Sequence, residues 1–95
     1  MSFPPRIVLH SPVSDQGALA AFVESCLRDG VRLIAIVGDG AEALEDEVDW
    51  LVIGDGADES RFVVTSSHPD ESLQDVIDFA AGWHCEREGL AEVRI

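Results

Sequence analysis

Two short polar segments contain the residue types from which a catalytic or ligand-binding site could be built. His10 and Ser11 end the first apolar segment of the chain, and Ser66 and His68 end the third. A histidine beside a serine can take the hydroxyl proton and make the oxygen a nucleophile, and two imidazoles can also bind a metal ion. The same residue types are common in the turns that follow strands. These four residues are the candidate site, with turn formation as the alternative explanation.

A carboxylate that orients an imidazole or completes a metal site could come from Asp15 or Asp39. The sequence contains neither the Gly-x-Ser-x-Gly of α/β hydrolases nor the His-Glu-x-x-His of zinc peptidases. The glycines beside Asp39 resemble part of a dinucleotide-binding loop, but Ala43 stands where the third glycine belongs, and Asp39 would repel a pyrophosphate. We therefore predict no cofactor and no metal site, and whether the protein is an enzyme stays open.

Four β-rich segments alternate with three amphipathic segments along the 95 residues. The β-rich segments lie at residues 6–10, 31–37, 61–65 and 90–95. Between them, apolar residues recur with the 3.6-residue period of a helix between residues 15 and 30, 40 and 54, and 70 and 84. Strands that are joined by helices pair in parallel through right-handed crossovers. The sequence predicts a single α/β domain over residues 1–95, in the order β-α-β-α-β-α-β.

The predicted architecture is a three-layer α/β/α sandwich with four parallel strands in the order 2-1-3-4. In its element order it resembles a shortened flavodoxin-like or Rossmann-like unit, a resemblance that covers the whole chain and implies no particular function. In this order the first and third strands are neighbours, and ligands of open α/β sheets bind beside the carboxyl ends of such strands. His10, Ser11, Ser66 and His68 are expected to converge there, with the two histidines about 5–10 Å apart.

The charge of the chain is strongly negative. Nineteen carboxylates against six arginines give a net charge of −13, and lysine, tyrosine and asparagine are absent. This composition excludes lysine Schiff bases and argues against a nucleic-acid partner, whose phosphates need clustered basic residues. Nine of the acids fall within residues 39–59, which contain no basic residue. This acidic face, residues 39–59, could bind a basic protein partner or simply keep the protein in solution.

The cysteines and the hydropathy pattern bear on location. Cys26 and Cys85 are too few for a disulfide scaffold, and we expect both to be reduced, with Cys26 buried. No apolar segment reaches the length of a membrane span, and the first residues do not resemble a signal peptide. We therefore predict a cytoplasmic protein with no membrane partner. The use of arginine alone as the basic residue is typical of a GC-rich bacterial genome.

The segment at residues 31–37 would be an edge strand in the order 2-1-3-4. It is apolar throughout except for Arg32. An open apolar edge pairs readily with other chains, and a second copy is its simplest cover, so we predict a homodimer. The alternative is a different strand order that places this segment in the middle of the sheet.

Two functions follow from these observations. The first is a small acidic module that acts through protein association, without intrinsic catalysis. The alternative is a small ligand-binding protein or hydrolase-like enzyme that uses His10, Ser11, Ser66 and His68 at the carboxyl edge of the first and third strands. A closed polar pocket among these residues would favour the alternative.

Overall fold

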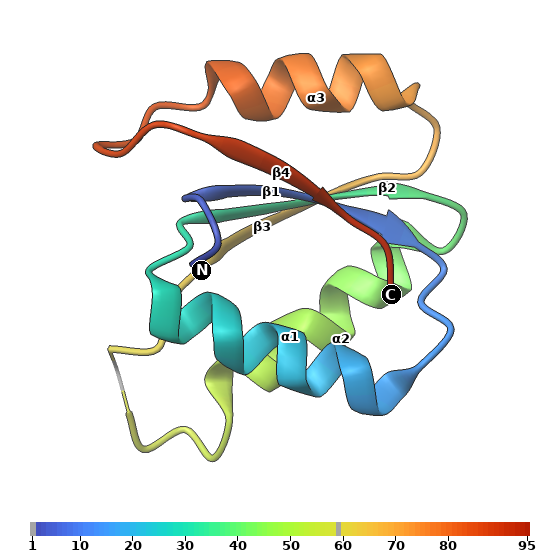
Figure 1. The fold of residues 1–95 in the computed structure, drawn as a ribbon. Coiled ribbons are helices and arrows are strands. Elements are labelled where there is room, and N and C mark those ends of the chain that lie inside the picture. Colours follow the sequence, from blue (N-terminus) through green and yellow to red (C-terminus); the bar gives the residue numbers. More distant parts are fainter. Residues whose placement is uncertain (1, 59) are drawn as a thin grey trace.

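The computed structural model describes residues 2–58 and 60–95. Its elements alternate along the chain (Figure 1): β1 (Arg6–Ser11), α1 (Gln16–Asp29), β2 (Leu33–Gly38), α2 (Ala41–Ile53), β3 (Val64–His68), α3 (Leu73–Gly82) and β4 (Leu90–Val93). All strand pairs are parallel. Helices α1 and α2 cover one face of the sheet, and α3 covers the other. The predicted element order, parallel pairing and three-layer α/β class are confirmed. Glu59, the last residue of the predicted acidic face, lies outside the described residues.

The predicted strand order 2-1-3-4 is wrong, because the sheet has the order β3-β2-β1-β4. Strands β1 and β2 form its centre, and apolar side chains cover both of their faces. Strands β3 and β4 are the edges, and their side chains are mostly only half-buried. Two strands that are apolar on both faces are most stable in the middle of a sheet, where both faces are covered. The order is that of the first four strands of the Rossmann fold, not of flavodoxin.

The central position of β2 removes the argument for a homodimer that was based on an open β2 edge. Residues 33–37 of this strand are buried, and its neighbours on the two sides are β1 and β3. The alternative raised from the sequence, a central second strand, is the one that the structure adopts. Self-association stays a prediction, now without its original premise.

Strand β3 begins three residues later than the sequence predicts and includes the segment expected to form a turn. Arg61 leads into the strand, and the pairing with β2 runs from Val64 to His68. Ser66 and His68 therefore lie within a strand, not beyond its end. Their side chains follow the two-residue alternation of a strand and project to the same face of the sheet.

The core has two parts, one on each face of the sheet. Ile7, Leu9, Ile34 and Ile36 pack against α1 and α2, whereas Val8 and Ala35 are among the residues that pack against α3. Cys26 belongs to the first part and is fully buried, as predicted. Burial raises the pKa of the Cys26 thiol to about 12, so this cysteine acts as a small apolar side chain. In residues 2–58 and 60–95, no helix is long and apolar enough to cross a membrane.

Arginine side chains bind the C-terminal ends of the helices. Arg61 donates through Nε and Nη2 to the carbonyl oxygens of Val52 and Leu51, near the end of α2, at 2.8 and 2.9 Å. Arg87 donates through Nη2 to the carbonyl oxygen of Asp29, the last residue of α1, at 3.0 Å. The last carbonyl groups of a helix lack hydrogen-bond donors within the helix and carry partial negative charge. A guanidinium group provides both the donors and a positive charge.

Arg6 performs the same function for α3 from a buried position in the sheet. Its side chain starts at the first residue of β1 and is 7% exposed. Nε donates to the carbonyl oxygen of Trp83, the C-cap residue of α3, at 2.9 Å. Nη1 donates to the carbonyl oxygens of Arg87 and Gly89 at 3.1 and 3.3 Å. Half of the six arginines are thus used to hold helix ends at the amino edge of the sheet.

Candidate functional site

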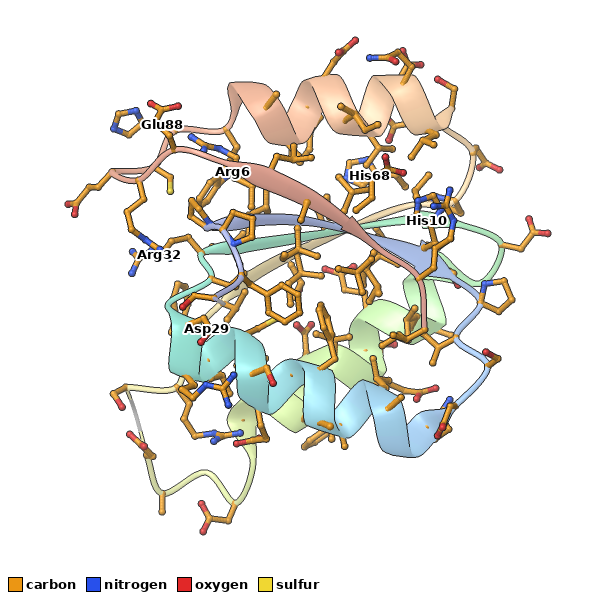
Figure 2. The ribbon with its side chains drawn as sticks, viewed as in Figure 1. Arg6, His10, Asp29, Arg32, His68 and Glu88 are labelled. Atoms are coloured by element: carbon orange, nitrogen blue, oxygen red, sulfur yellow. The ribbon has the colours of Figure 1, made fainter. Side chains whose placement is uncertain are left out.

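The structure does not bring the four predicted site residues into one crevice. Strand β2 lies between β1 and β3, and Val37 stands in register between His10 and His68. Both histidines lie at the same end of the sheet (Figure 2). Across two strand spacings their Cα atoms are about 10 Å apart. The prediction of a crevice between neighbouring first and third strands is therefore wrong. The candidate residues instead form two separate groups of side chains, one at β1 and one at β3.

The first group lies between β1 and β4. His10 Nε2 is 2.9 Å from Glu92 Oε1, and Ser11 Oγ donates to the carbonyl oxygen of Asp39 at 2.5 Å. Beside His10 is a hollow of about 320 Å³, whose remaining lining residues are Pro12, Ser14, Arg94 and Ile95. In the observed order the chain winds in opposite directions from β1 and β4, which is where open α/β sheets hold their ligands. Glu92 was not foreseen, because β4 was not expected beside β1.

The chain itself occupies the place where related folds hold phosphate. The side chain of Asp15 caps α1 and accepts the backbone N–H groups of Gly17 and Ala18 at 2.9 and 3.1 Å. Ser14 donates to the carbonyl oxygen of Ile95 through both its backbone N–H and its hydroxyl group. A helix N-terminus attracts anions through free N–H groups. The carboxylate of Asp15 already binds the N–H groups at the N-terminus of α1, so the geometry does not favour a nucleotide phosphate at this helix end.

The second group is a hydroxyl, an imidazole and a carboxylate in a row. His68 Nε2 is 2.9 Å from Ser66 Oγ, and His68 Nδ1 is 2.5 Å from Glu71 Oε2. The carboxylate accepts from Nδ1–H, which leaves Nε2 to accept the hydroxyl proton of Ser66. Chemically, this arrangement can transfer a proton from Ser66 to His68. Sequence reasoning found Ser66 and His68 but missed Glu71, although the spacing of three residues after His68 was a usable signal.

The surroundings of His68 limit what this group can do. The imidazole is buried and packs against the ring of Phe79, with the ring centroids 4.9 Å apart. The hollow beside His10 does not include Ser66 or His68, and neither does a hollow of about 280 Å³ at the opposite end of the sheet, beside Arg32 and Trp83. The group is therefore a hydrogen-bonded network at the end of β3, and neither of these two hollows provides it with a substrate cavity.

Metal binding has little support in the described ranges. Within residues 2–58 and 60–95, no group of three or more His, Cys, Asp or Glu side chains is placed to hold a metal ion. Asp55 Oδ1 accepts the backbone N–H of Ala57, and Asp58 Oδ1 accepts the backbone N–H and the hydroxyl of Ser60. These acids shape the loop between α2 and β3, and the hydrogen bonds that Ser60 donates lower the pKa of Asp58.

Helix α2 displays the main concentration of carboxylates. We define its acidic surface as Glu42, Glu45, Asp46, Glu47 and Asp49. Glu42, Asp46 and Glu47 are exposed, whereas Glu45 and Asp49 are half-buried beside β3. Among the described residues, no ion pair involves an acid of this surface. Glu45 and Asp49 contact the hydroxyl group of Thr65, and the other three carboxylates face solvent without a cation from the described part of the chain.

The fold and the strand order define a doubly wound α/β protein with the strand order of a Rossmann unit. Residues 4–93 match a protein family described as "Domain of unknown function (DUF7684)", and the chain belongs to this family. No curated protein and no solved structure showed a significant match to the chain.

Proposed function

We propose that this protein is a small binding module that associates with a basic protein partner through the acidic surface of α2, without catalysis of its own. The observation that carries this proposal is a set of five carboxylates on one helix, for which residues 2–58 and 60–95 provide no ion-pair partner. Like charges three and four residues apart on a helix repel one another. A basic partner would relieve that repulsion, so binding it gains free energy.

The arginines of the chain support the same conclusion. Arg6, Arg61 and Arg87 bind helix ends at the amino edge of the sheet. Arg61 also holds Glu24 through two hydrogen bonds of 2.6 and 3.1 Å, and it lowers the pKa of this carboxyl group. Arg61, which binds the end of α2, is therefore already paired with a carboxylate of α1. Positive charge from another molecule would complement the acidic surface, and this supports a basic partner.

Neutralising two exposed acids of this surface tests the proposal. We expect the double variant Asp46→Asn/Glu47→Gln to bind a fluorescent arginine-rich peptide about tenfold more weakly than the native chain, measured by fluorescence anisotropy at about 0.1 M salt. The control Glu86→Gln/Glu88→Gln changes the net charge equally but lies far along the chain, before β4. An equal loss in both variants would mean that only net charge matters, and it would contradict a site on α2.

A second candidate function is hydrolysis by acyl transfer, and the row Ser66–His68–Glu71 favours it. In that reaction Ser66 Oγ attacks a carbonyl carbon while its proton passes to His68 Nε2, which then gives the proton to the alcohol or amine that is displaced. Water releases the acyl group from Ser66 in a second step. If this candidate is right, a fluorophosphonate probe labels Ser66, detected by mass spectrometry, and Ser66→Ala abolishes the labelling. Ser67→Ala is the matched control, since it removes a neighbouring hydroxyl. Native protein that stays unlabelled would make the row a structural network and leave the binding module as the function.

A further inference from the structure

The outer edge of β3 has no partner strand among the residues that the structure describes. This strand ends the sheet next to β2 (Figure 1). The backbone N–H of Val64 donates to the carbonyl oxygen of Arg32 at 3.0 Å, so Val64 faces the neighbouring strand. Backbone groups alternate in direction along a strand, and the N–H and C=O groups of Thr65 and Ser67 therefore point outward. Such an edge can pair with an added strand.

We propose that an extended basic segment of a partner protein pairs with the outer edge of β3 as a fifth strand, with a basic side chain against Glu45 and Asp49. This inference rests on the proposed function, because it specifies how the basic partner binds. It adds two things to that proposal: the backbone of β3 as a binding surface, and an alternating sequence pattern in the ligand.

The carboxylates of Glu45 and Asp49 beside β3 offer more hydrogen-bond acceptors than the single hydroxyl group of Thr65 can satisfy. Thr65 Oγ1 lies 2.9 Å from Glu45 Oε2 and 2.6 Å from Asp49 Oδ1. A hydroxyl group has one proton, so it donates to only one of the two carboxylates at a time. Glu45 and Asp49 are also one helical turn apart on α2, where like charges repel. A guanidinium group offers five donors and a positive charge, which fits both carboxylates at once.

Strand geometry would place a basic side chain of the added strand beside Glu45 and Asp49. Residues that stand opposite each other in neighbouring strands project to the same face of the sheet. The side chain of Thr65 points to the face covered by α2, because it contacts two acids of that helix. A basic residue opposite Thr65 in an added strand would therefore lie beside Glu45 and Asp49. The next basic residue on this face would follow two positions later.

The other face of the added strand meets the α3 side of the sheet, where apolar groups lie next to Ser66 and His68. Val64 packs with the core under α3, and Phe79 on α3 is 42% exposed, with its ring against that of His68. Residues of the added strand opposite Val64 and Ser66 project to this face. The ligand that fits is thus an extended segment in which basic residues alternate with apolar ones.

A second copy of this chain fits the edge less well. Strand β3 carries no arginine, so pairing two β3 edges would bring two Glu45–Asp49 pairs together without a cation. The other edge strand, β4, has Glu92 at its centre, and Glu92 already pairs with His10. Each copy also carries a net charge of −13. Charge complementarity therefore selects a basic partner as the occupant.

Peptide probes separate strand addition from simple charge attraction. The probe is a capped, fluorescent peptide of about nine residues in which arginine and valine alternate, titrated with the full chain. Two derivatives carry N-methyl groups on alternate amides, one on the odd and one on the even positions. An added strand uses the N–H groups on only one of its edges, so one derivative should bind about tenfold more weakly and the other within about threefold of the parent.

Each other outcome has a distinct meaning. If both methylated peptides bind like the parent, charge alone drives binding, so the strand addition is overturned while the proposed function stands. If even the unmodified peptide does not bind, the proposed function fails and this inference fails with it. A dimer of the chain that the peptide dissociates, seen by sedimentation, would overturn the choice of a basic partner as occupant.

A proline in β3 provides an independent test. Ser67→Pro removes an outward N–H but no bond to β2, and prolines are tolerated on edge strands in this position. We expect it to weaken binding of the alternating peptide about tenfold, whereas Ser67→Ala leaves the affinity unchanged. Circular dichroism checks that both variants are folded, and the methylated peptides decide the question if Ser67→Pro does not fold. Full affinity in a folded Ser67→Pro variant would contradict pairing at this edge.

Discussion

Replacing Arg6 by methionine is expected to lower the free energy of unfolding by about 3–5 kcal/mol, measured by urea denaturation. Methionine keeps much of the length and the apolar stem of the side chain but has no donor. The carbonyl oxygens of Trp83, Arg87 and Gly89 would each lose a charged hydrogen bond in a partly buried region. Because these groups fix the end of α3 and the entry into β4, we also expect the β1–β4 pairing to weaken.

Arg32→Met is the matched control for this substitution. Arg32 precedes β2 at the same edge of the sheet, is exposed, and has no hydrogen bond or ion pair from its guanidinium group among the described residues. We expect its loss to change the free energy of unfolding by less than about 0.5 kcal/mol. Similar effects of the two substitutions would show that net charge, and not the hydrogen bonds of Arg6, is what stabilises the fold.

The element order could be predicted from the sequence because it depends on local patterns. Helical periodicity defines α1, α2 and α3, and the continuous apolar run of β2 indicates a strand that is covered on both faces. The strand order is not local, since right-handed crossovers can build more than one order from the same elements. The decisive signal was the contrast between apolar β1 and β2 and the polar residues of β3, which places β3 at an edge.

The candidate site could be predicted only in part, because some of its contacts are local in the sequence and others depend on the strand order. Ser66 and His68 are two residues apart, and strand alternation alone puts them on one face. Glu71 joins them only because β3 continues through His68 and the chain then turns toward α3. The partner of His10 is Glu92, more than eighty residues away, and it depends on β1 and β4 being neighbours. Contacts of this kind require the topology, which composition and periodicity do not provide.

Substituting Gly38 by alanine is expected to lower the free energy of unfolding by about 3–4 kcal/mol. Gly38 ends β2 with a φ of +110°, a conformation that residues with a side chain rarely adopt. A Cβ atom there would lie 2.5 Å from the backbone oxygen of Ser11, its partner in register on β1. The nearest atoms are all backbone atoms of Ser11, so no flexible side chain can move aside, and the ends of β1 and β2 would have to separate.

Gly82→Ala provides the control for this prediction. Gly82 is the last residue of α3, and an added Cβ atom there meets no other atom within 4 Å. Alanine at this position is expected to stabilise the protein slightly, by about 0.5 kcal/mol, because it restricts the unfolded chain and favours helix. The two alanine substitutions should therefore have opposite signs in urea denaturation. A loss of less than about 1 kcal/mol for Gly38→Ala would show that the carboxyl ends of β1 and β2 tolerate separation, and that Ser11 and His10 are not rigidly positioned.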